Sequence, residues 1–547
     1  GGGIDPEAAA RMEKLLRRQI EAAMEFLEED NYADARAKES IKKDAARAEK
    51  ELATWRAEHG EFYENGIRPA FKRAMVRRYE SSWNWGCQDA VRLFYQCVLR
   101  QRDWNDDWSH QIRRSLVNRA TPRLLSVVRS LSKKGKGVSG EGLDHWGVQQ
   151  AMATLATKMA AHLQSAPKYV PHCAFLEPIV DLDSRGAVTY SEGQRRECRD
   201  AVQYVASVSS TEKTKDGIPT LRMCTPKNKN QWDPATSGMY FNALREMSES
   251  GVSFEGKVAL VTGCSEGSIG IKIVSALLQG GAEVIATTSS FRNPARLEFF
   301  RRIFEENGAR GSSLTIVPFN QASRQDCAGL IDWIYTTKKL DLDIVVPFAA
   351  ISENGRDIGG IDDRSELAHR LMLTNLTRLL GGIKSAKEER EVVTRPAMVL
   401  LPLSPNHGLF GNDGLYAESK LGLECLLNKW DSEGWQDYLA LAGCVIGWTR
   451  GTGLMSANNI VAPGVENLGI RTFSTDEMAI NLIGLLTESM TYAACECPLW
   501  ADFGGNFGAV NDLKGESDSI RADVMRRAAV ARAISSDHAQ DRTGKSG

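Results

Sequence analysis

The chain has 547 residues, of which 42% are hydrophobic and 25% charged, and its formal net charge is −2 at pH 7. This length predicts two to four domains. A near-neutral chain has no bulk basic surplus, so we expect no nucleic-acid partner. We also expect no membrane partner and a cytoplasmic location, because no apolar run reaches the length of a membrane span and the N-terminus lacks a signal peptide's basic and apolar regions.

Eleven cysteines are scattered along the chain. The one close pair, Cys495-x-Cys497, has no second pair at zinc-ligand spacing. We therefore expect reduced thiols and no metal site. The chain starts without an initiator methionine, which indicates a fragment or processed piece of a longer protein.

Residues 1–165 have the pattern of a helical structural or assembly region. Residues 5–58 are rich in Ala, Glu, Lys and Arg, with apolar residues at helical spacing, which predicts a long amphipathic helix or helical pair. Further helices are predicted from Gln88 to about Arg100 and over 147–165. The glycine- and lysine-rich segment Lys133–Gly142 follows no predicted strand, which favours a flexible basic linker over a phosphate-binding loop.

Residues 166–250 break up into short apolar runs with several prolines. This texture predicts an irregular connecting module with a few strands, which ends in a short helix from Trp232 to Ser250.

Residues 251–515 open with a pattern typical of nucleotide binding. The buried strand Val258–Thr262 is followed by glycines at 263, 267 and 270 and by an apolar helix, Ile271–Leu278. Such a turn lets backbone N–H groups and a helix N-terminus meet a pyrophosphate, although glycines also serve ordinary tight turns. The cofactor contacts expected here are Thr262, Gly263, Gly267, Ser268, Ile269 and Gly270.

The second strand, Ala282–Thr288, ends without a carboxylate. A site for NAD usually has an acidic residue there for the ribose 2′-hydroxyl. Ser289 and Arg292 stand in its place and would suit the 2′-phosphate of NADPH. Alternatively, Arg292 is an ordinary surface residue.

Strands continue to alternate with helices through this region. The further strands expected are Leu314–Asn320, Asp343–Ile351, Ala397–Leu403 and Leu441–Gly447, with helices over 323–336 and 365–383. Six or seven such strands predict an α/β fold with a doubly wound, parallel, Rossmann-type sheet. Ligands bind such sheets at the C-terminal strand ends, where the glycine turn, Ser404 and the loop 447–455 fall.

A Tyr416-x-x-x-Lys420 pair begins the helix that follows Ser404. Four-residue spacing puts Tyr416 and Lys420 on one helix face, where the ammonium is expected to lower the phenol's pKa. A carbonyl reductase needs such a proton donor. The structural alternatives, without a catalytic role, are that Ser404 caps a turn and that the Asn375 side chain hydrogen-bonds to helix backbone groups.

The order of these residues resembles the short-chain dehydrogenase/reductases, in which Asn, Ser, Tyr and Lys form a catalytic tetrad. The chain also resembles the alpha subunits of fungal type I fatty acid synthases over nearly its whole length. The strings that carry this second resemblance are Ser82-Trp-Asn-Trp85, Gly267-Ser-Ile-Gly270, Val317-Pro-Phe-Asn-Gln321, Pro347-Phe-Ala-Ala-Ile351, Leu403-Ser-Pro-Asn-His-Gly408 and Ile446-Gly-Trp-Thr-Arg-Gly-Thr-Gly-Leu-Met-Ser-Ala-Asn-Asn459.

The resemblance implies reduction of a 3-oxoacyl thioester, carried as phosphopantetheine on an acyl carrier protein domain, with NADPH. Tyr416 would give the proton, Ser404 would bond the same oxygen, Lys420 would hold the nicotinamide ribose and Asn375 would anchor a relay water. Other alpha subunits and the beta subunit of a hetero-dodecamer are the implied partners. Further cofactor contacts implied are Asn320, Ala349, Ala350, Thr449, Gly451 and Thr452.

The chain departs from the wider reductase family at two places. One extra residue separates Gly267 from Gly270, and Ala349-Ala350 stand where Asn-Asn-Ala-Gly is usual. Residues 516–547 have the composition of a polar C-terminal linker or tail. Two alternatives stay open: a segment that is mainly a structural scaffold, and a reductase of a specialised synthase that supplies a short acyl starter, such as hexanoate, for a polyketide.

Overall fold

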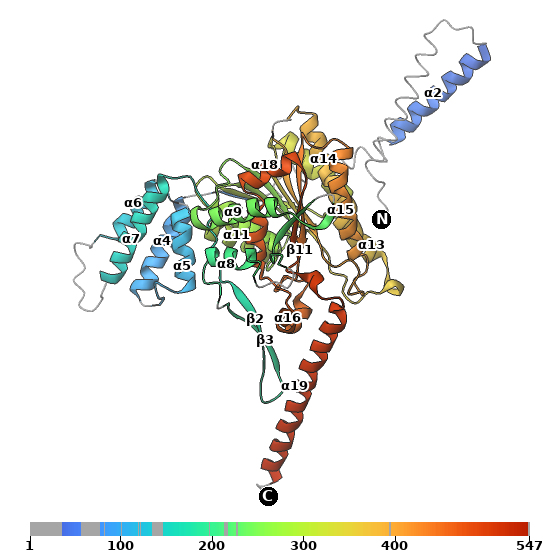
Figure 1. Ribbon diagram of the computed structural model, residues 1–547. Coiled ribbons are helices and arrows are strands. Elements are labelled where there is room, and N and C mark those ends of the chain that lie inside the picture. Colours follow the sequence, from blue (N-terminus) through green and yellow to red (C-terminus); the bar gives the residue numbers. More distant parts are fainter. Residues whose placement is uncertain are drawn as a thin grey trace.

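The computed structural model describes residues 35–55, 77–80, 83–99, 101–118, 120, 122–133, 146–195, 197–212, 217–225, 228–392 and 395–544. Its centre is a ten-stranded sheet in the order β1-β8-β7-β6-β9-β10-β11-β12-β4-β5, with helices on both faces (Figure 1). The strands are β1 (Arg77–Glu80), β4 (Arg222–Thr225), β5 (Asn228–Trp232), β6 (Val258–Thr262), β7 (Glu283–Thr288), β8 (Ser313–Pro318), β9 (Ile344–Pro347), β10 (Ala397–Leu403), β11 (Leu439–Ile446) and β12 (Leu499–Phe503).

The seven strands from β8 to β12 in that order run parallel, which confirms the predicted doubly wound sheet. The strands at both edges, β1 at one and β4 and β5 at the other, are antiparallel. Two expected strands are shorter than predicted: β8 ends at Pro318, and β9 ends at Pro347, so the residues after it form a loop.

Alternate residues of the parallel strands enter two cores. In β6, Ala259 and Val261 face one core and Leu260 faces the other. This is the two-residue period of a strand buried on both faces. The first core is covered by α8 (Ala201–Ser209), α9 (Pro234–Ser250), α10 (Ile269–Gln279), α11 (Pro294–Asn307), α17 (Thr475–Gly484) and α18 (Glu488–Glu496), and the second by α12 (Arg324–Asp332), α14 (Asn375–Glu388) and α15 (Tyr416–Ser432).

Residues 166–250 contribute strands and helices to the central unit, because β4 and β5 extend its sheet and α8 and α9 cover one face of it. Tyr204 of α8 and Tyr240 of α9 are fully buried in the sheet's core, and the Tyr240 ring stacks on Phe503 of β12 at 5.4 Å. The hairpin of β2 (Leu176–Leu182) and β3 (Val188–Gln194), by contrast, extends away from the sheet (Figure 1). The segment joins the sheet because β4 pairs with β12, which is distant in the sequence. The local residue pattern of the segment does not indicate this pairing.

Four helices in the N-terminal half share a core of their own. They are α4 (Trp83–Val98), α5 (Asp107–Asn118), α6 (Pro122–Leu131) and α7 (Trp146–Leu163), and Leu93, Leu124 and Met159 are fully buried among them. Helix α2 (Ala35–Trp55) falls within the long helix predicted for residues 5–58. The rest of that prediction, over 5–34 and 56–58, and the linker predicted over 134–142 lie outside the described residues.

The C-terminal segment forms α19 (Leu513–Gly544), a helix that projects from the sheet (Figure 1), where the sequence analysis expected a polar linker or tail. No glycine or proline interrupts residues 516–543, and the segment is rich in alanine, which favours helix. Val524 and Ala528 are buried, and Arg532 Nη1 donates to the Gly186 carbonyl at 3.0 Å. The helix is therefore docked on the β2–β3 hairpin.

Candidate active site

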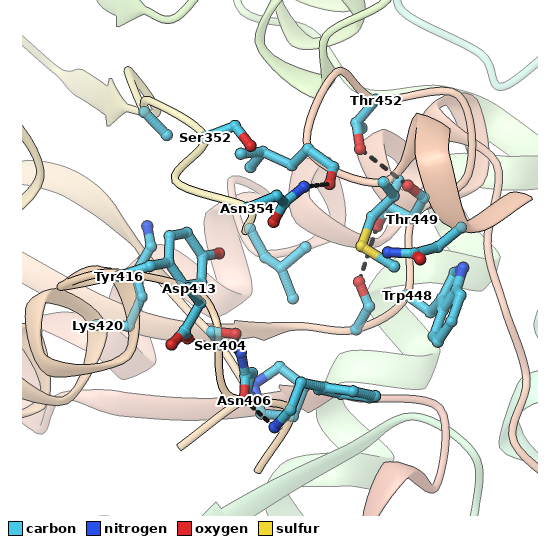
Figure 2. Close-up of a pocket in the computed structure, with 18 of the residues that line it drawn as sticks. Ser352, Asn354, Ser404, Asn406, Asp413, Tyr416, Lys420, Trp448, Thr449 and Thr452 are labelled. Atoms are coloured by element: carbon cyan, nitrogen blue, oxygen red, sulfur yellow. Dashed lines mark hydrogen bonds between the residues drawn. The ribbon is translucent and has the colours of Figure 1, made fainter. Parts of the chain in front are cut away.

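A cavity of about 660 Å³ lies where the parallel strands end. Loops after β6, β9, β10 and β11 line it, together with the first turns of α10, α15 and α19. Figure 2 shows Tyr416, Lys420 and Ser404 on one side of it, and Trp448, Thr449 and Thr452 on the other. C-terminal strand ends are where open parallel sheets bind ligands.

Ser404, Tyr416 and Lys420 come together at this cavity. Ser404 directly follows β10, Tyr416 begins α15, and Lys420 lies one turn further along that helix. The Lys420 ammonium donates to the Pro402 carbonyl at 2.8 Å and lies 5.4 Å from the centre of the Tyr416 ring. The structure thus joins a hydroxyl, a phenol and an amine at one end of the cavity.

The pKa of Tyr416 differs in direction from the expectation. Burial raises it, and hydrogen bonding to Ser404 opposes that rise, whereas a lowering by Lys420 was expected. The physical reason is that Lys420 is itself buried, which lowers its pKa to about 7, and its ammonium is bonded to a backbone carbonyl. Tyr416 therefore keeps its proton at neutral pH.

Asn375 is fully buried at the start of α14, directly after the π-helical turn η5 (Arg370–Thr374). Its Nδ2 donates to the Gln321 carbonyl at 2.8 Å, and its Oδ1 accepts from Arg378 at 2.7 Å. Its side chain does not line the cavity. Neither partner is helix backbone, so the side chain does not take the place that the structural alternative gave it; instead it ties the start of α14 to the loop after β8.

The glycine turn before α10 is shaped for close backbone approach. Gly263 has φ +74°, and a Cβ there would lie 2.5 Å from the Phe348 carbonyl carbon. A Cβ on Gly270 would lie 2.6 Å from the Gly263 oxygen. Ser268 caps α10 by accepting from Ile271 N–H at 3.2 Å, and the remaining first-turn N–H groups have no intrahelical acceptor. Gly263, Ser268, Ile269 and Gly270 line the cavity, an arrangement that fits a pyrophosphate.

Thr262 stands behind the cavity. Its hydroxyl donates to Gln321 Oε1 at 2.9 Å and accepts from Ala349 N–H at 3.1 Å, so it joins the end of β6 to the segments that follow β8 and β9. Among the other expected cofactor contacts, Ala350, Thr449 and Thr452 line the cavity. Gly267 and Gly451, each next in the chain to a lining residue, approach each other, because a Cβ on Gly267 would lie 3.4 Å from the Gly451 oxygen.

Seven expected cofactor residues are not part of the cavity lining. Four of them each adjoin a lining residue in the chain (Thr262, Gly267, Ala349 and Gly451), and the other three are Ser289, Arg292 and Asn320. Ser289, Arg292 and Asn320 are exposed after the ends of β7 and β8. Asn320 Oδ1 accepts from Ala322 N–H at 3.0 Å, so this side chain closes its own turn. The structure does not bring these three residues to Tyr416.

Several cavity residues escaped the sequence analysis. Asp413 precedes Tyr416, accepts from Asn406 Nδ2 at 3.0 Å, and has a pKa that burial raises. Glu353 is buried and accepts from Leu415 N–H at 3.0 Å. The cavity is also lined by Phe410, Phe507, Lys514, Ser517 and Arg521. No motif marks any of them, and two, Ser517 and Arg521, belong to the segment expected to be a tail.

Arg450, between Thr449 and Gly451, is fully buried behind the cavity. Its Nε donates to Glu192 Oε1 of β3 at 2.9 Å, its Nη2 donates to the Leu176 carbonyl at 2.8 Å, and its Nη1 donates to the Thr472 hydroxyl at 2.6 Å. The loop after β11 is thereby tied to the β2–β3 hairpin. Partners so distant in the chain leave no local signal.

Within the part of the chain that the structure describes, no three His, Cys, Asp or Glu side chains are grouped as metal ligands would be. Among the same residues, none of the helices combines the length and the apolar character that crossing a membrane requires.

Comparison with known proteins identifies relatives of this chain. The family model of the fatty acid synthase type I helical domain matches residues 9–213. The fatty acid synthase subunit alpha of Schizosaccharomyces pombe is 38% identical over 98% of this chain and 33% of its own length. This chain is related to the alpha subunits of fungal type I fatty acid synthases. The Penicillium patulum subunit alpha is 37% identical over the same shares.

The chain spans about a third of the length of these alpha subunits. The resemblance noted from the sequence is thus confirmed. Among solved structures, the L-sorbose reductase of Gluconobacter frateurii, complexed with NADPH and L-sorbose, is 19% identical, covers 46% of this chain and 98% of its own, and has a TM-score of 0.38.

Proposed function

We propose that this chain is the 3-oxoacyl-[acyl carrier protein] reductase segment of a fatty acid synthase and that NADPH is its reductant. The observation that carries the proposal is the meeting of Ser404, Tyr416 and Lys420 in a cavity that also contains the glycine turn of α10. The kinship with synthase alpha subunits favours an acyl thioester as the substrate. By the same kinship, an acyl carrier protein domain, other alpha subunits and a beta subunit are the proposed partners, and the cytoplasm is the proposed location.

The residues present fit a nicotinamide dinucleotide. Gly263, Ser268, Ile269 and Gly270 would hold its pyrophosphate, and Thr449 and Thr452 would face it from the loop after β11. Ser289 and Arg292 would meet a 2′-phosphate at the end of β7. When bound, NADPH supplies the hydride that the β-carbon of the thioester receives.

Tyr416 would give its proton to the β-oxygen. Burial raises the pKa of its phenol, so the proton is present at neutral pH when charge develops on the substrate. Ser404 would donate a second hydrogen bond to the same oxygen. Two donors aimed at a developing negative charge in a buried site are the largest electrostatic contribution available to these residues.

Lys420 would stabilise the phenolate that remains and return a proton to it. Its pKa of about 7 suits that exchange near neutral pH. Asn375 would anchor a relay water, since its side-chain amide uses one donor and one acceptor site in the bonds described above and has a further one of each.

A second role, in assembly, is favoured by one observation. Helices α4 to α7 form a core separate from that of the sheet, and they fall within the residues matched by the helical-domain family model. Catalysis and assembly are compatible, and mass photometry of the whole chain would report any association.

The test is turnover. Purified protein should oxidise NADPH in the presence of acetoacetyl-pantetheine and release the 3-hydroxybutyryl thioester, identified by mass spectrometry. Turnover with NADH should be slower than with NADPH, and Arg292→Ala should reduce the difference between the two rates. Protein that binds NADPH without turnover would contradict the reductase and leave assembly as the role.

A further inference from the structure

One wall of the cavity comes from α19. Lys514, Ser517 and Arg521 line it at positions i, i+3 and i+7, which lie on one face of a helix. Two cationic side chains therefore flank a hydroxyl on that wall. Asp518 lines the same cavity, so the wall carries two positive charges and one negative charge.

Two buried donors at this cavity have no hydrogen-bond partner among the described residues. Ser517 is 8% exposed and its Oγ is unpaired, and Trp448 is 4% exposed with its Nε1 unpaired. Each unpaired buried polar group costs about 1–3 kcal/mol, and such groups are rare in native proteins. Their presence in one cavity points to a ligand that accepts hydrogen bonds.

The cations are placed to meet an anion. Lys514 is exposed, and its Nζ would lie 3.9 Å from a Cβ on Gly411, so it reaches toward the loop that follows Ser404. Arg521 donates from Nη2 to Asn458 Oδ1 at 2.7 Å, which holds its guanidinium at the cavity wall. A phosphate, with charge and several acceptor oxygens, matches this donor set.

An aromatic surface lines the same cavity. The Phe410 ring packs edge-on against Trp448, with centroids 6.5 Å apart, and against Phe507 at 5.7 Å. Such a surface suits an uncharged, flexible arm better than a second charged group.

We infer that the α19 wall binds the phosphate of a phosphopantetheine arm whose thioester end lies at Ser404 and Tyr416. This inference rests on the proposed function, because it assigns the carrier arm of that substrate. Lys514 and Arg521 supply charge, and Ser517 supplies a hydroxyl donor.

Calorimetric titration of the full chain with 4′-phosphopantetheine and with pantetheine tests the inference without turnover. The phosphate should raise affinity by about tenfold, as expected for a charge-assisted contact. The gain should shrink as salt is added. The double variant Lys514→Ala/Arg521→Gln should lose the gain and keep the affinity for pantetheine. Glutamine retains an amide donor for Asn458, which preserves that contact.

Arg526→Ala is the matched control. Arg526 lies on the same helix, is 71% exposed, pairs with Asp523 and does not line the cavity. Its removal should leave both affinities unchanged. If the double variant folds poorly, Lys514→Ala is used alone, because it alters an exposed side chain. It should remove part of the gain in affinity that the phosphate gives.

Equal affinity of the wild-type protein for the two ligands would overturn the inference. So would a fall in NADPH affinity in the double variant, because the wall would then belong to a cofactor phosphate. Turnover of acetoacetyl-pantetheine without any gain from the phosphate would overturn it and leave the reductase intact. A phosphate gain in a protein without turnover would support the site and contradict the proposed function.

Discussion

The cavity has two kinds of wall, the edge of the parallel sheet and the segments that cover it. The edge is built from strand ends: Ser404 after β10, the glycine turn after β6, and Tyr416 at the start of the next helix. The cover is α19, which docks on the β2–β3 hairpin, and that hairpin is joined to the loop after β11 by contacts such as Arg450 with Glu192.

The two walls differ in what holds them. Backbone pairing and apolar burial fix the edge. The cover is held by apolar contacts of Leu513 and Ile520 and, through the β2–β3 hairpin, by the buried contacts of Arg450. We therefore expect changes at the edge to alter chemistry and changes in the cover to alter stability first. Each substitution below separates these two effects or shows that they are coupled.

Arg450→Met should have the largest effect on folding. It leaves Glu192 without its buried partner and should lower the free energy of unfolding by about 3–5 kcal/mol. Urea denaturation followed by circular dichroism measures this. As a control, Lys429→Ala breaks an exposed pair with Glu433 and should cost less than about 1 kcal/mol. Equal effects of the two changes would mean that the cover does not depend on Arg450.

Ser404→Ala should act on chemistry at the edge. Loss of one donor to the developing charge should lower kcat roughly hundredfold, or about 2.7 kcal/mol, while the free energy of unfolding changes little. Steady-state kinetics with acetoacetyl-pantetheine would measure the first and urea denaturation the second. If the variant lost stability and kept kcat, Ser404 would be a turn cap.

Gly270→Ala should weaken the nucleotide turn. The added Cβ would meet the Gly263 oxygen at 2.6 Å, which should cost roughly 1–3 kcal/mol and lower the affinity for NADPH. Gly238→Ala is the matched change in α9, where a Cβ meets nothing within 4 Å, and it should stabilise by about 0.5–1 kcal/mol. Calorimetric titration would measure the NADPH affinity of both variants, and thermal unfolding would measure their stability. An unchanged NADPH affinity in Gly270→Ala would show that the turn does not bind the cofactor.

Lys420→Met should stabilise the protein in a pH-dependent way. The folded-state pKa of Lys420, about 7, lies below that of an unfolded lysine, so the unfolded state holds more protons between the two values. The penalty for burying the charge is complete below pH 7 and fades as pH rises toward 10. The variant should therefore gain roughly 1–3 kcal/mol at pH 6 and less at pH 9.5, as measured by urea denaturation. A gain that grows with pH would contradict this ionisation.

The sequence predicts the edge better than the cover, because the edge is encoded locally. Apolar runs, glycines and the Tyr416–Lys420 spacing sit within short windows, and the structure places them at one cavity. Strand β12 was missed because its five residues include Asp502, whose charge is paired with Arg222 of the distant β4. The α19 wall was missed for a similar reason, since polar composition alone does not reveal where a helix docks.

The central claim is that Tyr416 is the proton donor of a reductase, and Tyr416→Phe tests it most directly. Single-turnover oxidation of bound NADPH with acetoacetyl-pantetheine would be followed by the loss of nicotinamide absorbance. The account predicts a rate at least about a thousandfold lower than wild type, with NADPH affinity within about twofold. A variant that oxidises NADPH at a rate near that of wild type would contradict it.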